Sequence, residues 1–393
     1  MTMDALRFGV FYAPFHPLDE NPTLFFERDR ALWELYDKLG FDELWIGEHH
    51  SGGYEMIASP EVMAAAALER TRRIRVGTGV KSLSFHNPFV VAQAMVQLDH
   101  MSRGRAMFGV GPGALPMDAA QLGLDPSRTR ALMGETLDVI MRLLAGERVT
   151  VETENFRLRD AKLHLDPYTK PHMEMAVTTI RSPAGAMAAG KHGLGLLSLG
   201  GASDMAVAAY AKNWQICAET ARQHGKSVDR RNFRVAIQMH IAPTREEARE
   251  DVRFGLAGWA RYAHDVLPAR PIPPEVTDPV QFLIDNGGAV IGTPDDAVRL
   301  IERAQKGSGG FGVVMFMAHD WADWPATMRS YELFARYVMP RLNATLGSRQ
   351  ESYDLSRDRR DALVPKVQEG VADAERRLAE QKAPRPKRKE AAQ

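Results

Sequence analysis

An acidic residue and two histidines follow directly on an apolar stretch of this chain. Residues 40–50 read Gly-Phe-Asp-Glu-Leu-Trp-Ile-Gly-Glu-His-His, so an expected strand ends at Glu48, His49 and His50. Ionisable side chains at the end of a strand are typical of an active-site rim. An ordinary histidine has a pKa of about 6.5 and can donate or accept a proton near neutral pH. The chemistry indicated is acid–base catalysis, with His49 as the catalytic candidate.

The two histidines have two other possible roles, in packing and in metal binding. Neighbouring side chains of a strand point to opposite faces, so His49 and His50 do not face one pocket if the strand continues. One of them is then a packing or capping residue. The same divergence argues against zinc held by both histidines with Glu48 or Glu55, and no further well-spaced ligand set follows. We expect no metal site.

Composition limits the functions open to the chain. It has 393 residues, 45% hydrophobic and 25% charged, which suits one large domain with appendages or two domains. Lys plus Arg and Asp plus Glu number 50 each, so no net charge attracts nucleic acid or an anionic membrane. The single cysteine, Cys217, excludes a disulfide framework and a cysteine-rich metal site. With neither a secretion signal nor a membrane-length apolar run, we expect a cytoplasmic protein.

Short apolar runs alternate with longer amphipathic segments along the chain, which predicts βα units and a parallel sheet. The expected strands are 6–12, 43–47, 74–80, 106–111, 174–180, 195–199, 235–241 and 312–317. Helical patterns lie between them at 24–39, 60–70, 88–101, 128–144, 204–223, 293–306 and 324–339. Eight strands with crossover helices favour a (β/α)8 barrel, with the active site where the strands end. A doubly wound open sheet is the alternative, because periodicity does not show closure.

Two segments interrupt the alternation and one follows it. Residues 146–171 contain the runs 149–151 and 156–158, which predict a small hairpin before the fifth strand. Residues 263–290 contain five prolines and a Gly-Gly pair, so we expect an irregular loop that covers the ligand or is disordered. We expect a barrel over 1–345 and a charged extension over 346–393, with a helix near 362–381 and a solvated basic end.

Several motifs, in their order and spacing, resemble the bacterial luciferase-like flavin monooxygenases. They are Phe8-Gly9-Val10-Phe11, the run 40–50, Val76-Gly77-Thr78-Gly79-Val80 and the segment 97–105. Segments 182–198 and 318–324 are similar to the branch that includes limonene monooxygenase-type enzymes. The resemblance covers about residues 6–342 and is specific for the superfamily, not for the substrate.

The resemblance implies a (β/α)8 barrel that binds FMN as FMNH2, which reacts with O2 to a C4a-(hydro)peroxyflavin that oxygenates an organic substrate. It maps the catalytically important first histidine of the family's Glu-His-His motif onto His49. It also implies a homodimer, and a separate NAD(P)H:flavin reductase, since no second nucleotide-binding domain is evident. The alternatives are a deazaflavin-dependent oxidoreductase of the same superfamily and a non-catalytic flavin-binding protein.

Candidate groups for the flavin phosphate follow the fifth expected strand. They are Thr178, Thr179, Arg181 and Ser182, with Pro183 placed to open the next helix. Hydroxyls, a cation and a helix N-terminus all suit a phosphate, although Ser182 is also what an ordinary N-cap would be. Where luciferase has a cysteine and a phosphate-binding arginine, this chain has Gly111 and Pro112, so the phosphate charge is left to a residue such as Arg181.

Candidate contacts to the flavin ring lie after the third and fourth expected strands. Gly79 and Gly111 would leave room for a flat ring, and a tight βα turn is the other explanation of these glycines. Asn87 can donate to and accept from the ring's polar edge, although Asn-Pro is also a turn signal.

Apolar side chains at or near strand ends are candidates for the substrate pocket. They are Phe11, Tyr12, Tyr54, Met239 and Phe316. Such a pocket suits a small apolar organic substrate: a terpene, alkane, aldehyde or aromatic compound. The sequence does not separate hydroxylation, epoxidation and Baeyer–Villiger insertion.

Overall fold

The structure, a computed structural model, describes residues 6–180 and 182–382. The chain separates into two units, residues 1–343 and residues 344–393. Arg181 and the basic end after residue 382 lie outside the described residues.

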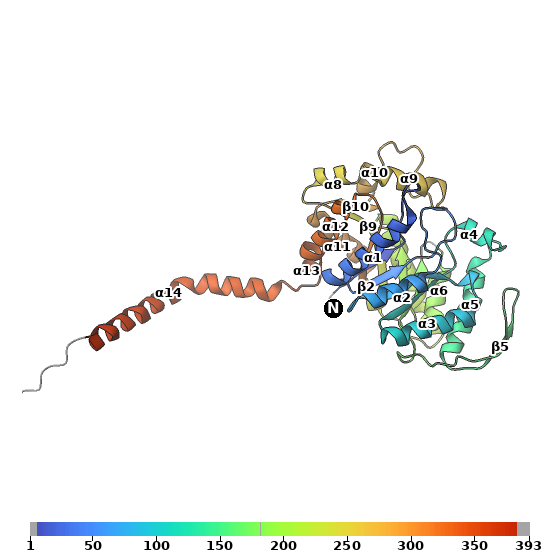
Figure 1. The fold of residues 1–393 in the computed structure, drawn as a ribbon, viewed down its shortest axis with the longest axis horizontal. Coiled ribbons are helices and arrows are strands. Elements are labelled where there is room, and N and C mark those ends of the chain that lie inside the picture. The colour runs from blue at the N-terminus through green and yellow to red at the C-terminus, as the bar shows by residue number, and fades with distance from the viewer. Residues whose placement is uncertain (1–5, 181, 383–393) are drawn as a thin grey trace, which may run out of the picture. The chain divides into compact units, whose positions relative to one another are not determined.

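Eight parallel strands close into a barrel in the first unit (Figure 1). Their order around the barrel is β9-β11-β1-β2-β3-β4-β7-β8, and β8 pairs with β9 to complete the ring. The strands are β1 (Arg7–Tyr12), β2 (Glu43–Ile46), β3 (Arg75–Ser82), β4 (Ala106–Gly111), β7 (Met175–Thr179), β8 (Gly195–Leu199), β9 (Phe233–Ile241) and β11 (Val313–Met317). Closure confirms the predicted (β/α)8 barrel and excludes the open doubly wound sheet.

Helices follow the strands and cover the outside of the barrel (Figure 1). They are α1 (Pro22–Leu39), α2 (Pro60–Arg70), α3 (Pro88–Ser102), α5 (Thr129–Leu144), α6 (Ala184–His192), α7 (Asp204–Gln223), α11 (Pro294–Ser308) and α12 (Trp324–Leu333), with a short α13 (Met339–Leu342) after α12. Local sequence sets where several begin: α11 starts with Pro294 after Thr293, which forms a reciprocal capping box with Asp296. The amphipathic pattern located most of these helices to within a few residues. It did not include α6, and the helix expected at 324–339 ends as α12 at Leu333.

Short elements lie in the two insertions and after β4. The hairpin β5 (Val149–Glu152) with β6 (Arg157–Ala161) confirms the one predicted there, and α4 (Pro116–Gln121) follows β4. Between β9 and α11 lie α8 (Arg245–Asp251), α9 (Leu256–Asp265), α10 (Pro279–Asp285) and β10 (Ala289–Gly292). The expectation of an irregular loop over 263–290 is corrected here: β10, buried throughout, pairs with the end of β9, and α10 precedes it.

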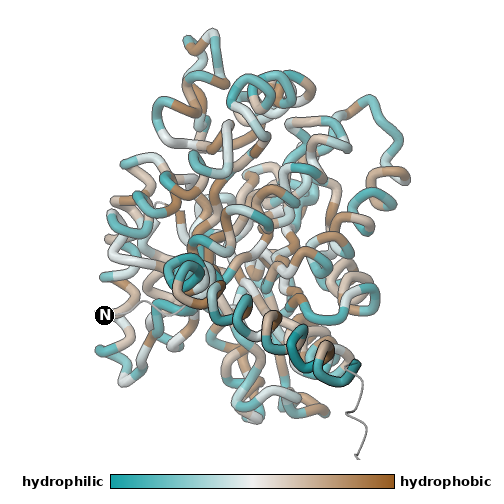
Figure 2. The backbone as a smooth tube through the Cα atoms, turned by 90° about the vertical axis from the view of Figure 1, so that its left-hand side faces the viewer, coloured by the Kyte–Doolittle hydropathy of each residue, from teal (hydrophilic) through white to brown (hydrophobic). Residues whose placement is uncertain are grey.

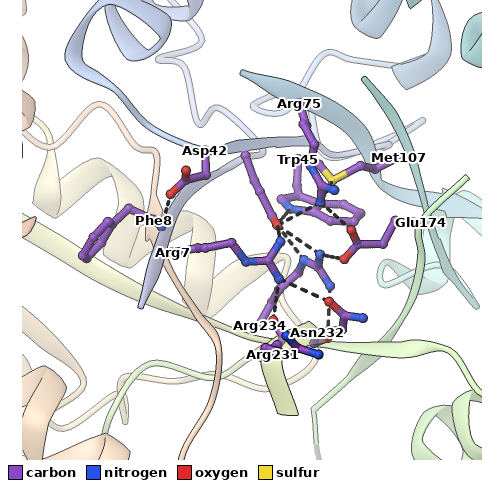
Figure 3. Close-up of polar contacts among 11 residues, drawn as sticks. Arg7, Phe8, Asp42, Trp45, Arg75, Met107, Glu174, Arg231, Asn232 and Arg234 are labelled. Atoms are coloured by element: carbon purple, nitrogen blue, oxygen red, sulfur yellow. Dashed lines mark hydrogen bonds and ion pairs between the residues drawn. The ribbon is translucent and has the colours of Figure 1, made fainter. Parts of the chain in front are cut away.

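Charged side chains fill the barrel interior where the strands begin (Figure 3). The guanidinium of Arg234 is fully buried and donates to Glu43 Oε2 at 2.6 Å and Oε1 at 3.0 Å. It also pairs with Glu174, while Arg7 and Arg75 contact Glu43 at 2.9 and 3.1 Å. Burial alone would raise the pKa of Glu43, but Arg234 and the other two arginines lower it to about 2. Opposite charges thus satisfy one another where water is excluded.

Above this ionic layer the barrel interior is apolar. Trp45 covers Arg234, with 4.8 Å between the guanidinium carbon and the ring centre, and donates from Nε1 to Glu43. Phe11, Met107 and Met315 belong to the same inner cluster. Side chains at the alternate positions of the strands point outward. Val10 and Phe108 are examples, and they pack in a separate core with the surrounding helices.

The second unit contains one helix, α14 (Gly347–Lys382), in its described residues. None of its side chains is buried, and it contains Pro365. Figure 2 shows its tube mostly in hydrophilic colours. Its apolar side chains, such as Val367 and Leu378, are exposed. The helix begins 15 residues before the segment that the sequence pattern indicated, residues 362–381, because polar helix formers continue the turn without an apolar stripe. Among the described residues, no helix combines the length and apolar character needed to cross a bilayer.

The ionic layer leads to a stability prediction. Replacing Arg234 by Met leaves the carboxylate of Glu43 buried without its main partner, which costs about 3–5 kcal/mol. Urea unfolding of Arg234→Met beside the parent protein measures this loss. The control is Arg148→Met, which removes an exposed pair with Asp160 and changes stability by less than about 1 kcal/mol. Equal losses in both variants would contradict a special role for the buried pair.

Candidate active site

The carboxyl ends of the strands carry the ionisable residues that the sequence analysis singled out. β2 ends at Ile46, and the chain then turns back, with the amide of His49 donating to the carbonyl of Ile57 at 2.9 Å. The strand stops before the two histidines, so strand alternation does not apply to them, but their rings still diverge: His49 faces Glu55 and Asp118, while His50 faces Glu48.

His49 lies between two carboxylates. Its Nε2 is 2.8 Å from Glu55 Oε2 and its Nδ1 is 3.2 Å from Asp118 Oδ2. Asp118, in α4, also accepts from the amide of His50 at 3.1 Å and from the hydroxyl of Ser51. Burial favours the neutral ring, but Glu55 and Asp118 outweigh it and raise the pKa of His49 to about 10. The ring is therefore a cation at neutral pH, in contrast to an ordinary histidine.

Glu48 connects the ends of β2 and β3. Its Oε1 accepts from Lys81 at 2.9 Å and from His86 at 2.6 Å, and its Oε2 accepts from the amide of Ser82 at 2.5 Å. Burial would raise the pKa of Glu48, but the contacts with His50, His86 and Lys81 hold it well below its usual range. Three possible ligand groups, from Glu48, His50 and His86, lie within 4.8 Å of one another. The ammonium of Lys81 already pairs with the Glu48 carboxylate at 2.9 Å, so we do not assign these residues as metal ligands.

Aromatic side chains lie beside His49 on the side of the β9–α11 insertion. Phe15 and Tyr54 stack at 4.6 Å between ring centres, and Tyr262 of α9 contacts both rings at 5.4 and 5.0 Å. We name these three residues the aromatic cluster. The hydroxyl of Tyr262 donates to Glu55 at 3.1 Å, so the cluster joins the polar residues around His49. An apolar wall thus meets a charged imidazole at the barrel's open end.

The hydroxyls predicted for the phosphate separate into two groups. Thr179 is buried and its hydroxyl lies 2.5 Å from that of Ser198, so it is used within the protein. Thr178 is only partly buried, and Ser182 accepts from the amide of Ala184 at 3.3 Å at the start of α6. Ser182 is thus the described side chain that bonds the first amide of α6, and the Thr178 hydroxyl donates to the Val110 carbonyl at 3.4 Å. Gly185 brings this helix onto β7, since a Cβ there would lie 2.1 Å from the Thr178 carbonyl. Thr178, Ser182 and the α6 amides form one donor set.

The predicted ring contacts are not brought together. A Cβ at Gly79 would lie 2.7 Å from Trp45 Cβ, and one at Gly111 would lie 2.6 Å from both Thr178 Oγ1 and Val80 Cγ2. These glycines therefore allow close packing of neighbouring strands, which corrects the expectation of free space for a flat ring. Asn87 is exposed and caps α3, its side-chain oxygen accepting from Phe89 at 3.0 Å, so the turn interpretation fits it better.

The predicted pocket residues do not all face the barrel interior. Phe11 lies in the barrel interior and Tyr54 in the aromatic cluster. Tyr12, Met239 and Phe316 belong instead to the core between barrel and helices: Tyr12 donates to Asp29 of α1, and Phe316 contacts Tyr331 of α12. These three expectations are corrected, because the side chains occupy the outward positions of their strands.

Sequence reasoning missed Asp118 and Tyr262. Asp118 is 69 positions from His49 along the chain, in a six-residue helix with no distinctive motif. Tyr262 lies just before the segment that was expected to cover the site, and the apolar stripe of α9, with Trp259 and Ala263, is the signal that could have drawn attention to it.

A second histidine between carboxylates lies where β1 ends. His16 Nδ1 is 2.7 Å from Asp320 Oδ2, and its Nε2 is 3.2 Å from Asp29 Oδ1. Arg28 contacts the same Asp320 oxygen at 3.1 Å. Burial would lower the pKa of His16, but the two carboxylates raise it to about 9. This cluster ties the segment after β1 to α1 and to the segment after β11.

Known proteins match this chain over most of its length. The model of the luciferase-like monooxygenase family matches residues 6–310. Limonene 1,2-monooxygenase of Rhodococcus erythropolis is 43% identical over 385 residues, which are 98% of this chain and 99% of the relative. 4-Hydroxyprotoasukamycin monooxygenase of Streptomyces nodosus subsp. asukaensis is 43% identical over 362 residues, 89% and 96% of the two chains. The alignment with the Rhodococcus protein therefore extends through most of the C-terminal unit.

A solved structure shares the fold. It is the oxygenating constituent of 3,6-diketocamphane monooxygenase from Pseudomonas putida, described as a type II Baeyer–Villiger monooxygenase in complex with FMN. It is similar with a TM-score of 0.71 at 25% identity, over 86% of this chain and 98% of that chain.

The His16 cluster predicts a pH-dependent stability. A pKa raised from 6.5 to about 9 means that the ion pairs contribute fully below pH 6.5 and are lost as the pH rises through about 9. The stability difference between the parent and His16→Asn should thus be larger at about pH 6 than at about pH 9.5, by about 2–3 kcal/mol. Urea unfolding at both pH values measures it, and a difference independent of pH would contradict the ion pairing of His16.

Proposed function

Because this chain belongs to the luciferase-like monooxygenase family, we propose that it is the oxygenase component of a two-component flavin-dependent monooxygenase. It takes reduced FMN from a separate reductase and oxygenates a small apolar organic molecule. The observation that carries this proposal is the meeting of His49 and the aromatic cluster at the carboxyl ends of the barrel strands.

The donor set at the start of α6 suits the phosphate of FMN. Thr178 and Ser182 offer hydroxyls, and α6 offers the first-turn amides that follow Ala184, whose own amide bonds Ser182. A phosphate at this position would also interact favourably with the positive end of the helix. We propose Thr178, Ser182 and these amides as its binding groups, in place of Thr179.

The residues around His49 suit oxygen chemistry. Bound reduced FMN supplies the electrons that activate O2. The aromatic cluster excludes water from that side of the site, and Phe11 adds apolar surface from the barrel interior. His49, charged and held through Nδ1 by Asp118, donates a proton or a hydrogen bond from Nε2 to the oxygen being transferred, in exchange for its contact with Glu55.

The relatives support an apolar substrate. The 43% identical Rhodococcus protein is named for limonene, and the Pseudomonas structure for a diketocamphane. Limonene is a hydrocarbon, so it needs a pocket with few polar groups. The aromatic cluster and Phe11 meet that need, and we propose a terpene-like compound as the substrate class.

Incorporation of oxygen from ¹⁸O2 tests the proposal. The full chain is incubated with FMN, NADH, a flavin reductase of another source and limonene, and the products are analysed by mass spectrometry. We expect one ¹⁸O atom per product molecule, with no product when the chain or the reductase is omitted. Turnover only with a deazaflavin would favour the deazaflavin-dependent alternative, and flavin binding with no turnover across apolar alkenes and cyclic ketones would favour a non-catalytic flavin protein.

Replacement of His49 separates catalysis from binding. His49→Ala should lower product formation by about 100-fold, while the Kd for FMN changes by less than about tenfold, because the imidazole supplies protons and not binding energy. The control His192→Ala removes a histidine that contacts Asp138 at the far end of α6, and it should keep the parent rate. Full activity of His49→Ala would exclude His49 from the mechanism.

Paired variants test the phosphate site. Thr178→Val combined with Ser182→Ala should weaken FMN binding by at least about 100-fold, because each hydrogen bond to a charged group contributes about 1.5–3 kcal/mol. Binding of riboflavin, which lacks the phosphate, should stay at the parent level. Fluorescence titration of both flavins gives the comparison, and equal weakening for both would contradict phosphate recognition.

A further inference from the structure

The proton count on His49 is fixed by its surroundings. Carboxylates accept hydrogen bonds and do not donate when ionised, so a ring that contacts Glu55 through Nε2 and Asp118 through Nδ1 must carry a hydrogen on each nitrogen. A neutral imidazole has only one N–H and would leave one of these contacts unsatisfied. The geometry thus describes an imidazolium whose two nitrogens both face carboxylates, with Nδ1 hydrogen-bonded to Asp118 and Nε2 ion-paired with Glu55, in a side chain that is 12% exposed.

Asp118 is held in place by the segment that follows His49. Its side chain is 1% exposed, and its Oδ1 accepts from the His50 amide at 3.1 Å and from the Ser51 hydroxyl. Burial would raise the pKa of Asp118, but the bonds from His49 and Ser51 lower it, so the group stays ionised. The carboxylate therefore fixes the orientation of the His49 ring relative to α4.

Glu55 is held from the other side by the insertion between β9 and α11. The same Oε2 atom that contacts His49 accepts from the hydroxyl of Tyr262 at 3.1 Å. Tyr262 is buried and packs on Tyr54, the residue before Glu55. Gly52 adopts φ +83°, a conformation that favours glycine, and a Cβ there would lie 3.2 Å from Val266 Cγ1 at the C-terminal end of α9. Helix α9 thus sets where Glu55 sits.

We propose that Glu55, Asp118 and Tyr262 are positioning residues that hold His49 as a fixed imidazolium, so that it acts as a cationic donor and not as a neutral base. The inference rests on the proposed function, because it assigns a role within that reaction. Only the proton on His49 is transferred in this step, and Asp118 stays a carboxylate.

The charges that face His49 come from three elements. Glu55 lies in the segment after β2, Asp118 in α4, and the neutral phenol of Tyr262 in α9. His50, the next residue, is paired with Glu48 on the opposite side. Two negative charges thus oppose one positive charge, and the raised pKa of His49 has the sign that this arrangement requires. Removal of either carboxylate should ease loss of the proton.

A histidine titration followed by NMR tests the inference directly. Full-length protein with ¹³C-labelled histidine is titrated from about pH 5 to 10.5, with and without FMN, and His49→Gln identifies the signal. We expect the His49 signal to keep its charged chemical shift to beyond pH 9. Glu55→Gln and Asp118→Asn should each lower its midpoint by at least about one pH unit, and Tyr262→Phe by less. A midpoint of about 6.5 in the parent protein would overturn the inference without requiring any variant to fold.

A matched control comes from the other histidine that lies between carboxylates. Asp320→Asn removes one of the two partners of His16 and should move the His16 midpoint while leaving that of His49 unchanged. If Asp320→Asn shifts both signals alike, the effect is a general change of charge and the positioning role of Glu55 and Asp118 is refuted.

Activity against pH links the titration to the reaction. The alkaline fall in ¹⁸O incorporation should follow the NMR midpoint, moving to lower pH in Glu55→Gln and Asp118→Asn, and Glu55→Asp should restore part of the shift. A profile that stays unchanged while the midpoint moves would refute the catalytic role of the positioning residues. A high midpoint with no oxygenation in any form would refute the proposed function and leave the held imidazolium intact.

Discussion

The buried pairing of Arg234 with Glu43 is the interaction on which the rest of the barrel depends. Eight strands that close on themselves direct every second side chain inward, and the inner space must be filled. Where the strands begin, this chain fills it with three arginines and two glutamates that form ion pairs with one another, covered by the indole of Trp45. That end of the barrel is filled by side chains. The strands can therefore leave space only at their other ends, which is where His49, the aromatic cluster and the α6 donor set lie.

Carboxylates organise that open end as well. Glu48 joins β2 to β3, Asp118 joins α4 to the segment after β2, and Asp320 joins the segments after β1 and β11. Each carboxylate is held against cationic or N–H donors in a region with little water, so each contact is strong and specific in direction. The chain has equal numbers of acidic and basic residues and uses many of them in this way. Its net charge of zero therefore coexists with ordered ion pairs inside the protein.

Hydrophobic periodicity was enough to predict the strands, most helices and the barrel, because a parallel sheet buried on both faces leaves a clear apolar signal. It did not predict which way a strand-end side chain points. Tyr12 and Phe316 sit one position away from inward-facing Phe11 and Met317, and a shift of one residue reverses the face. Asp118 and Tyr262 reach His49 only through folding, and Arg181 lies outside the described residues. The candidate histidine was accessible from sequence; its protonation state was not, since that depends on partners far along the chain.

Tyr262 belongs to a segment that the barrel does not need for closure. Helix α9 lies between β9 and β10, outside the eight-stranded ring, yet it supplies both part of the aromatic wall and the hydroxyl that holds Glu55. An exchange of this one insertion between related proteins would alter the shape offered to a substrate and the electrostatic state of His49 in a single step. Substrate selectivity and the reactivity of His49 therefore change together in this architecture. A design that replaces the insertion must also supply a new hydrogen-bond donor to Glu55.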